Sequence, residues 1–231
     1  MTSGFTGNES AWFESMPGAG SITRYENEEE WNRERLRHIS ASEAADVIGV
    51  GFSDNVSLWE RKCGIKEAAE FSEATKQLMQ RGSDAEAHIR ELFAIDNGID
   101  NMHDGTLTLI TSRENPFMTC TLDAWYGSKQ GATILEVKRS ESSKTFSDGL
   151  PMKYRAQMIH QMYVTGIKHA VLCAYIRTAY SRTNDALVRT FRLEADDDDV
   201  MYDMEKLVEA EIVFWDNVKR KERPAKIIPW I

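Results

Sequence analysis

Apolar positions in the middle of the chain fall into short runs, which turn-forming residues separate. Three of these runs, 106–112 (TLTLITS), 117–126 (FMTCTLDAWY) and 132–139 (ATILEVKR), are rich in threonine, isoleucine, leucine and aromatic residues. This composition is typical of β-strands, and the short connections predict an antiparallel meander. The segments 169–176 (HAVLCAYI) and 186–193 (ALVRTFRL) predict two further strands.

Helical spacing of apolar and charged residues predicts helices on either side of these strands. The predicted helices cover residues 26–37, the segment SEAADVIGV with Ser42 as its N-cap, the segment VSLWERKCG up to Gly64, and residues 73–97, 151–165 and 196–221. Residues 1–22 are rich in Gly, Ser and Thr and show no sustained periodicity, which predicts a loosely ordered tail. Residues 23–231 then form a single α/β domain, with a mixed sheet and helices packed on it.

The helix predicted over 73–97 places Gly82, Glu86, Ile89 and Phe93 along one side, because they lie four, three and four residues apart. A carboxylate therefore stands among apolar residues. Such a carboxylate is costly to bury unless a cation or a metal ion receives it. Glu86 is thus either the partner of a buried cation or part of a functional site.

Composition narrows the class of protein. Hydrophobic residues make up 42% and charged residues 28% of the 231 positions, which excludes a disordered chain. No apolar run is long enough to span a bilayer, and the N-terminus has no secretion signal, so a cytoplasmic protein without a membrane partner is expected. Cys63, Cys120 and Cys173 lie far apart and lack neighbours at zinc spacing, which predicts reduced thiols.

The balance of charge limits how the protein binds nucleic acid. The net charge of −9 and the pI of about 5.2 argue against a surface that is basic throughout, so any contact with DNA must be local. Residues 138–155 carry more Lys and Arg than Asp and Glu. This segment is either a loop that follows DNA or a solvated loop without that role.

A carboxylate and an amine stand together in the run LEVK. Because side chains alternate in a strand, Glu136 and Lys138 point to one face while Leu135 and Val137 point to the other, buried face. A hairpin with the preceding strand would bring Asp123 close to Glu136. Phosphodiester hydrolysis uses such a set, because carboxylates bind Mg²⁺, the metal activates water and a cation assists at the phosphate. The same pattern also fits a cross-strand salt bridge.

The order and spacing of several motifs resemble the phage lambda exonuclease family, the YqaJ-type viral recombinases with a PD-(D/E)xK nuclease core. RLRHISASEAADVIG resembles the opening block of the family, RGSDAEAHIRELF its Gly-x-x-x-Glu helix, TCTLDAW its strand ending in an acid, LEVKRS its Glu-x-Lys strand and YRAQMIHQMYVTG its Tyr-x-x-Gln helix. The resemblance runs from about residue 33 to 176. It implies a restriction-endonuclease-like core, with a mixed central β-sheet flanked by α-helices.

The resemblance implies roles for the matching positions. The positions implied to hold a metal ion are Glu86, Asp123, Glu136 and Val137. Lys138 is implied to be the catalytic lysine, and Gln157 a catalytic polar partner near the metal. From the residues alone, Gln157 also fits a polar ridge with Tyr154 and Gln161 on the same helix face. The usual Pro-Asp-Gly run is replaced by Leu-Asp-Ala around Asp123, so the backbone after this acid is less predictable.

The resemblance also implies a pocket for the 5′-phosphate of a DNA strand. The matching positions are Arg35, Ser42, Thr121, Lys144 and Tyr154. Lys144 stands where the family has an arginine, and lysine engages phosphate only as a point charge, so a weaker grip is expected there. Without the resemblance, Arg35 fits an exposed ion pair with the glutamates of its own helix.

The implied activity is Mg²⁺-dependent digestion of linear double-stranded DNA from 5′ to 3′. Mononucleotides are released, and a 3′ single strand remains for phage-type homologous recombination. One or two Mg²⁺ ions are implied, with Mn²⁺ as a substitute, and the implied partners are DNA ends, a ring-shaped homotrimer and a single-strand annealing protein. The alternatives are an endonuclease of the same core and a catalytically inactive, DNA-end-binding recombination scaffold.

Overall fold

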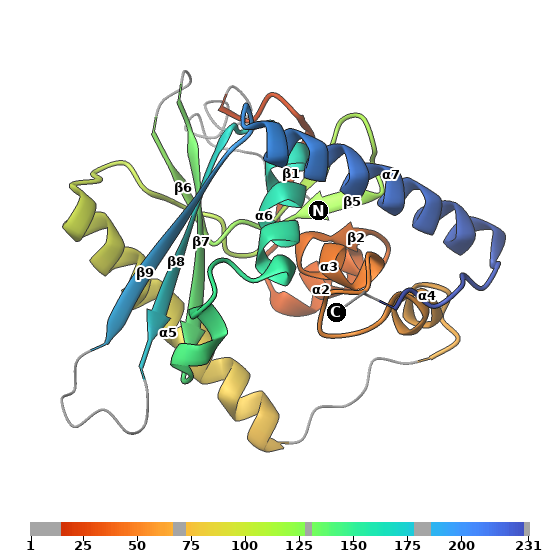
Figure 1. The fold of residues 1–231 in the computed structure, drawn as a ribbon, viewed down its shortest axis with the longest axis horizontal. Helices are drawn as coiled ribbons and strands as arrows, with labels where there is room; N and C mark the ends of the chain where they lie inside the picture. The colour runs from red at the N-terminus through yellow and green to blue at the C-terminus, as the bar shows by residue number, and fades with distance from the viewer. Residues whose placement is uncertain (1–14, 67–72, 128–130, 178–185, 229–231) are drawn as a thin grey trace.

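Two β-sheets form the frame of the protein (Figure 1). The computed structural model describes residues 15–66, 73–127, 131–177 and 186–228, without the side chains of 73–84. The strands are β1 (Ala19–Arg24), β2 (Ile39–Ser40), β3 (His103–Asp104), β4 (Thr108–Ser112), β5 (Met118–Cys120), β6 (Ala124–Tyr126), β7 (Thr133–Ser140), β8 (His169–Ile176) and β9 (Leu187–Glu194). One sheet has the order β1-β4-β5-β2 and the other the order β3-β6-β7-β8-β9.

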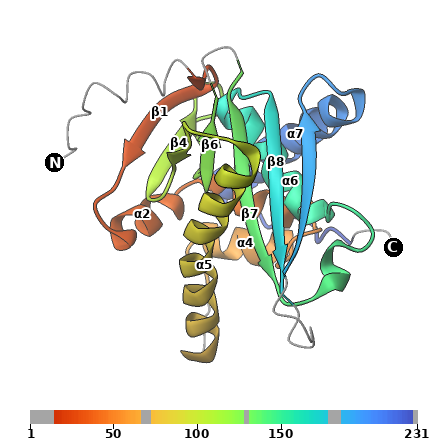
Figure 2. The same ribbon diagram turned by 90° about the vertical axis from the view of Figure 1, so that its left-hand side faces the viewer.

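Helices cover both faces of the five-stranded sheet. The helices are α2 (Glu28–Arg35), α3 (Ala44–Val47), α4 (Asn55–Lys62), α5 (Glu73–Asn97), α6 (Met152–Thr165) and α7 (Asp198–Arg220), with short 3-10 turns η1 (Ala41–Glu43) and η2 (Ser143–Phe146). Figure 2 shows α5 in front of this sheet and α6 and α7 behind it. Helix α6 also contacts β4 and β5, so it lies between the two sheets.

Both sheets are mixed. β7 pairs in parallel with β8 and antiparallel with β6, while β2 pairs in parallel with β5. The predicted α/β fold with helices on a mixed sheet is therefore confirmed, and the antiparallel β4–β5 and β6–β7 pairs agree with the predicted meander. The described strands form a second, smaller sheet beside the five-stranded one, because the chain crosses from one sheet to the other between Cys120 and Ala124.

The crossing replaces the single strand predicted over 117–126. Here Leu122 is fully buried in the main core, and its carbonyl faces Gly105. A Cβ atom on residue 105 would lie 2.1 Å from the Leu122 carbonyl oxygen, so only glycine allows this approach. The close packing fixes the backbone on the N-terminal side of Asp123.

Two predictions about the N-terminal part are corrected. Within the predicted tail, residues 1–14 lie outside the described residues, but Met16, Ala19 and Ile22 are buried and β1 pairs with β4. The tail prediction is thus wrong for residues 19–22. Ser42 is not a helix N-cap: a capping box joins Ser40 to Glu43 and begins η1, which α3 then follows.

The remaining helix predictions agree with the structure to within a few residues. Helix α5 spans the predicted range, and Pro151 is the N-cap of α6 rather than a residue of its first turn. Ile89 and Phe93 of α5 are buried against β7 and β8, whereas the surroundings of the Gly82 position lie outside the described side chains. The three cysteines are free thiols. Across the described residues, no helix combines the length and the apolarity needed to cross a membrane.

Candidate active site

The side chains of strand β7 alternate between a face that packs in the core and a face that carries the charged residues. Leu135 and Val137 are fully buried in the cluster that α5 covers. Glu136 and Lys138 point to the opposite face, where α6 lies, as the sequence predicted. The strand therefore holds two functional side chains on a backbone that is fixed by pairing on both edges.

Glu136 is a buried carboxylate with a complete set of donors. Only 1% of the residue is exposed. Its Oε1 accepts a hydrogen bond from Gln157 Nε2 at 2.6 Å, and its Oε2 accepts one from Gln161 Nε2 at 2.6 Å. Because both donors come from one face of α6, this helix fixes the orientation of the carboxylate. Gln157 thus lies where the sequence predicted, in contact with the acid of the Glu-x-Lys run.

Lys138 forms an ion pair with Glu136, and their Nζ and Oε1 atoms are 2.5 Å apart. Burial lowers the pKa of this amine, but the charges of Glu136 and Asp123 outweigh burial and raise the pKa above its ordinary value. The ammonium group also lies 5.5 Å from the centroid of the Tyr154 ring. Lys138 therefore places a positive charge beside the Glu136 carboxylate.

Asp123 lies at the end of the crossing, immediately before β6. Its Oδ2 accepts a hydrogen bond of 2.7 Å from the backbone N–H of Val137, and its carbonyl accepts one of 2.9 Å from Arg90 Nη1. Burial and the nearby charge of Glu136 raise the pKa of Asp123 well above its usual range. Asp123, Glu136 and Lys138 are thus brought together by geometry, as the sequence predicted. Their chemical roles stay predictions.

Glu86 reaches the same site from α5. Burial raises the pKa of its carboxyl, the charge of Lys138 lowers it and that of Glu136 raises it, and the result is a raised pKa. Glu86 also raises the pKa of Asp123 by its charge. The site therefore combines three carboxylates from α5, the sheet crossing and β7 with one ammonium group.

The donor set suits a hard divalent cation. Carboxylates that raise one another's pKa repel each other when they are ionised, and a Mg²⁺ ion bound by their oxygens would relieve that repulsion. No group of three or more His, Cys, Asp and Glu is arranged for metal binding among the described residues. Both oxygens of Glu136 are engaged by Gln157, Gln161 and Lys138, so this carboxylate would have to give up one of these contacts to bind a metal ion. The apolar side chain of Val137 lies in the core, so this residue can contribute only through its backbone.

The sequence profile of the YqaJ-like viral recombinase domain matches residues 30–168, which is more than half of the chain. The chain belongs to this family. The matched region extends from α2 to the end of α6 and contains every residue of the site just described. No match was found among curated proteins.

Solved structures share the fold of this family member. An alkaline exonuclease from Laribacter hongkongensis (LHK-Exo) has a TM-score of 0.62 at 23% identity, and 84% of this chain covers 96% of that one. The complex of LHK-Exo with dAMP has a TM-score of 0.61 at 24% identity, with the same coverage. A phage-related exonuclease from Haemophilus somnus 129PT has a TM-score of 0.50 at 18% identity, and 80% of this chain covers 96% of that one.

In this member of the YqaJ-like family, the predicted phosphate-binding residues Arg35 and Ser42 contact each other. The Nη2 atom of Arg35 donates to Ser42 Oγ at 3.2 Å and to Ser40 Oγ at 3.4 Å. Burial lowers the pKa of the guanidinium, and the charge of Glu43 raises it, with burial dominant. The predicted alternative, an exposed ion pair of Arg35 with its helix neighbours, is not what the geometry shows. Those neighbours bind Arg33 and Arg37 instead.

Thr121 is linked to Arg35 through an aromatic ring. The Thr121 hydroxyl accepts a hydrogen bond of 3.0 Å from the indole N–H of Trp31 and donates one of 2.8 Å to the Thr108 carbonyl. The Arg35 guanidinium carbon lies 4.3 Å from the centroid of the Trp31 ring. Among the predicted phosphate-binding residues, Arg35, Ser42 and Thr121 thus form one connected group.

The other two predicted phosphate-binding residues lie elsewhere. Lys144 is exposed on η2. Tyr154 belongs to the carboxylate site, because Lys138 lies over its ring, and it stacks on Phe146 with a centroid distance of 5.7 Å. The structure therefore does not bring Lys144 or Tyr154 into contact with the Arg35 group.

Two residues of this region escaped the sequence analysis as site residues. Gln161, there named only as a ridge position, is fully buried and donates to Glu136. Lys62 of α4 donates to Glu43 Oε2 at 2.7 Å and to the carbonyls of His38 and Arg35, so it braces the chain that carries Arg35 and Ser42. The i, i+4 spacing of Gln157 and Gln161 was a usable signal, whereas no local pattern ties Lys62 to Arg35.

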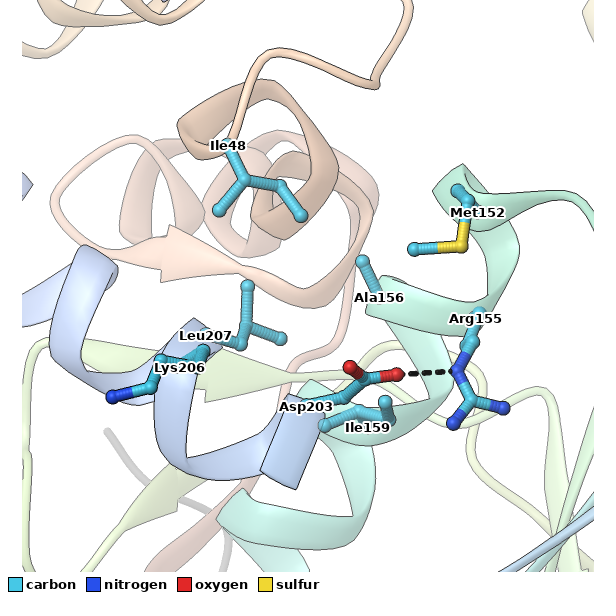
Figure 3. A pocket seen from close by; sticks show the side chains of 8 residues that line it. All are labelled: Ile48, Met152, Arg155, Ala156, Ile159, Asp203, Lys206 and Leu207. Carbon is cyan, nitrogen blue, oxygen red and sulfur yellow. Dashed lines mark hydrogen bonds and ion pairs between the residues drawn. The ribbon is translucent and has the colours of Figure 1, made fainter. Parts of the chain in front are cut away.

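A small pocket lies on another side of α6, where this helix meets α3 and α7 (Figure 3). It has a volume of about 120 Å³ and is lined by Ile48, Met152, Arg155, Ala156, Ile159, Asp203, Lys206 and Leu207. Arg155 Nε donates to Asp203 Oδ2 at 2.7 Å across its rim. The carboxylates of the candidate active site do not line this pocket, so it belongs to helix packing and is separate from the site.

Proposed function

We propose that this protein is a metal-dependent nuclease that degrades linear double-stranded DNA from its 5′ ends. The observation that carries the proposal is the convergence of Asp123, Glu136 and Lys138, with Glu86 beside them. Membership of the YqaJ-like viral recombinase family and the fold shared with exonucleases support it. Mononucleotides would be released, and the remaining 3′ single strand would serve recombination.

The chain's own residues suggest how the reaction is arranged. Glu86, Asp123, Glu136 and the backbone of Val137 would hold one or two Mg²⁺ ions, with Mn²⁺ as a substitute, and the metal would supply an activated water. Lys138 would place its positive charge beside the scissile phosphate. Gln157 and Gln161 keep the Glu136 carboxylate oriented.

The decisive experiment compares linear and covalently closed circular duplexes of the same sequence in Mg²⁺. An exonuclease that needs an end is expected to release acid-soluble nucleotides from the linear form and to leave the circle intact. Nicking of the circle would instead favour the endonuclease alternative. Binding without any metal-dependent release would favour the inactive scaffold.

A second prediction concerns the 5′ end of the strand. Arg35 is half-buried, and burial already disfavours its charge, so its guanidinium is poised to gain from an anion. Replacing Arg35 with glutamine is expected to reduce the preference for 5′-phosphate over 5′-hydroxyl ends by roughly tenfold or more. The measurement is the ratio of initial digestion rates on the two duplexes, each labelled at one terminus.

The matched control is Arg33, which lies on the same helix but is paired with Glu29 in solvent. Arg33→Gln is expected to keep the wild-type preference. An unchanged ratio in the Arg35 variant would remove Arg35 from the phosphate pocket without touching the nuclease assignment.

The proposed assembly is a ring-shaped homotrimer around DNA, with a single-strand annealing protein as a further partner. Its test is the molar mass in solution.

A further inference from the structure

Lys62 places a buried ammonium group against the chain segment that carries Arg35 and Ser42. The Lys62 side chain, on α4, is 1% exposed. Its Nζ atom donates to Glu43 Oε2 at 2.7 Å, to the Arg35 carbonyl at 3.4 Å and to the His38 carbonyl. Three acceptors match the three N–H donors of an ammonium group. Lys62 is therefore charged and held in one place.

Glu43 connects this ammonium group to the side chains of the proposed phosphate pocket. Its Oε2 atom also accepts hydrogen bonds of 3.0 Å from the backbone N–H and from the hydroxyl of Ser40. The Ser40 hydroxyl oxygen accepts a hydrogen bond of 3.4 Å from Arg35 Nη2 and lies 3.3 Å from the Ser42 hydroxyl oxygen. A continuous run of contacts therefore joins Lys62 to Arg35 and Ser42.

The charges of this group do not balance. Lys62 and Arg35 contribute two positive charges and Glu43 one negative charge, so one positive charge is in excess. Within the described ranges, no carboxylate lies at ion-pair distance from Arg35, and the neighbouring Arg61 is paired with Asp46. Burial lowers the pKa of Lys62, Glu43 raises it, and the charge of Arg35 lowers it further. The two cations thus repel each other, and an anion bound by Arg35 would relieve this repulsion.

Glu43 is the anion that competes for Arg35. Its charge acts on the guanidinium, but its Oε2 atom contacts Lys62 and Ser40 instead. While Lys62 holds the carboxylate, the guanidinium keeps its charge for another anion. Without Lys62, the carboxylate would be drawn toward Arg35 and would compete with a phosphate group.

We propose that Lys62 is a positioning residue of the 5′-phosphate pocket: it keeps the Glu43 carboxylate away from Arg35 and so reserves the guanidinium for the terminal phosphate of a DNA strand. The proposal rests on the proposed function and deepens it. Lys62 acts through Glu43 and Arg35 and does not itself touch the phosphate. The preference for phosphorylated ends therefore depends on a buried residue of another helix.

The test measures binding of a DNA hairpin whose single open end carries a 5′-phosphate or a 5′-hydroxyl group. Fluorescence anisotropy gives the two dissociation constants, with a label in the loop and Ca²⁺ replacing Mg²⁺, and their ratio is the preference for phosphate. Lys62→Met is expected to lower this preference about tenfold. Lys62→Met combined with Glu43→Gln is expected to regain most of it, because the competing carboxylate is gone. A purely structural role of Lys62 would give no such recovery.

Glu43→Gln on its own tests the same balance of charge in a protein that keeps Lys62. The glutamine oxygen can still accept a hydrogen bond from Lys62, while the excess rises from one positive charge to two. The preference for phosphate is therefore expected to be at least as high as in wild type. A lower preference would overturn the proposal. Circular dichroism checks the fold of each variant, and Glu43→Gln decides alone if Lys62→Met does not fold.

The control is Lys219→Met on α7, because Lys219 is solvent-exposed and paired with Asp216. This variant is expected to keep the wild-type preference. A wild-type preference in Lys62→Met, or a loss that the double variant does not recover, would overturn the positioning role alone. Equal binding of the two hairpins by wild type would overturn the phosphate pocket together with this role. Digestion of linear duplex DNA by wild type decides separately whether the nuclease function stands.

Discussion

Replacing Lys138 with alanine is expected to abolish DNA digestion while the protein stays folded. Lys138 is the positive charge nearest to the buried Glu136, and burial makes such a charge worth far more at a developing phosphate charge than in water. Its removal is expected to lower the rate by roughly a hundredfold to a thousandfold or more. Release of acid-soluble nucleotides from linear duplex DNA measures the effect, and a thermal melt followed by circular dichroism checks the fold.

The fold is expected to survive because Glu136 keeps both glutamine donors from α6. Lys168 provides the control, since its ion pair with Asp196 is solvent-exposed and the residue lies outside the site. Lys168→Ala is expected to digest DNA at the wild-type rate. Full activity in Lys138→Ala would refute the assignment of the catalytic centre.

The largest expected effect on stability lies in a buried pair between α6 and α7. His160 Nδ1 and Glu211 Oε1 are 2.9 Å apart, and each side chain is 1% exposed. His160 Nε2 faces the Thr119 carbonyl at 3.0 Å, so this nitrogen carries a proton, and a carboxylate opposite Nδ1 requires a second one. Replacing His160 with leucine leaves Glu211 buried without its cation and is expected to lower the free energy of unfolding by about 3–5 kcal/mol.

Urea denaturation of four proteins separates the pair from its packing: wild type, His160→Leu, Glu211→Met and the double variant. The double variant is expected to lose much less than the sum of the single losses, because it leaves no uncompensated charge. Additive losses would show that the ion pair contributes nothing of its own.

The same pair predicts how stability depends on pH. Burial lowers the pKa of His160, but the charge and the hydrogen bond of Glu211 outweigh it, so the pKa in the folded protein is raised. The folded state therefore binds more protons than the unfolded state above the ordinary histidine pKa of about 6.5. The stabilisation is fully present below that pH and is lost as the pH rises through the folded-state pKa. The difference in unfolding free energy between wild type and the double variant is expected to shrink toward alkaline pH.

Sequence patterns were sufficient to predict the bounds of those elements in which buried positions repeat regularly. Strand β8 and helix α5 have the predicted bounds because their apolar positions repeat over many residues. Strand β1 was missed because AGSITR contains Gly, Ser and Thr and becomes a strand only through its pairing with β4. β2 and β3 have two residues each, which is too short to leave any periodicity.

The residues of the candidate active site divide in the same way: local sequence patterns place some of them, and only tertiary packing places the others. Alternation in β7 was enough to place Glu136 and Lys138 on one face. The hairpin of β6 with β7 places Asp123 beside Glu136 as predicted, whereas the crossing between the two sheets just before Asp123 left no pattern in the sequence. The contact of Gln161 with Glu136 depends on how α6 lies across β7, and the brace from Lys62 joins residues on separate helices. Such contacts arise from tertiary packing and leave no local pattern.

The arrangement of the two sheets sets the distance between the proposed 5′-phosphate pocket and the proposed point of cleavage. Ser42 and Arg35 flank β2 of the four-stranded sheet, whereas Glu136 and Lys138 stand on β7 of the five-stranded sheet. Helix α6 fills the space between, so it works as a spacer of fixed thickness. The length of the fragment cut from a gripped DNA end would then be dictated by the width of a helix, and thinning or thickening its buried side chains would shift the point of scission.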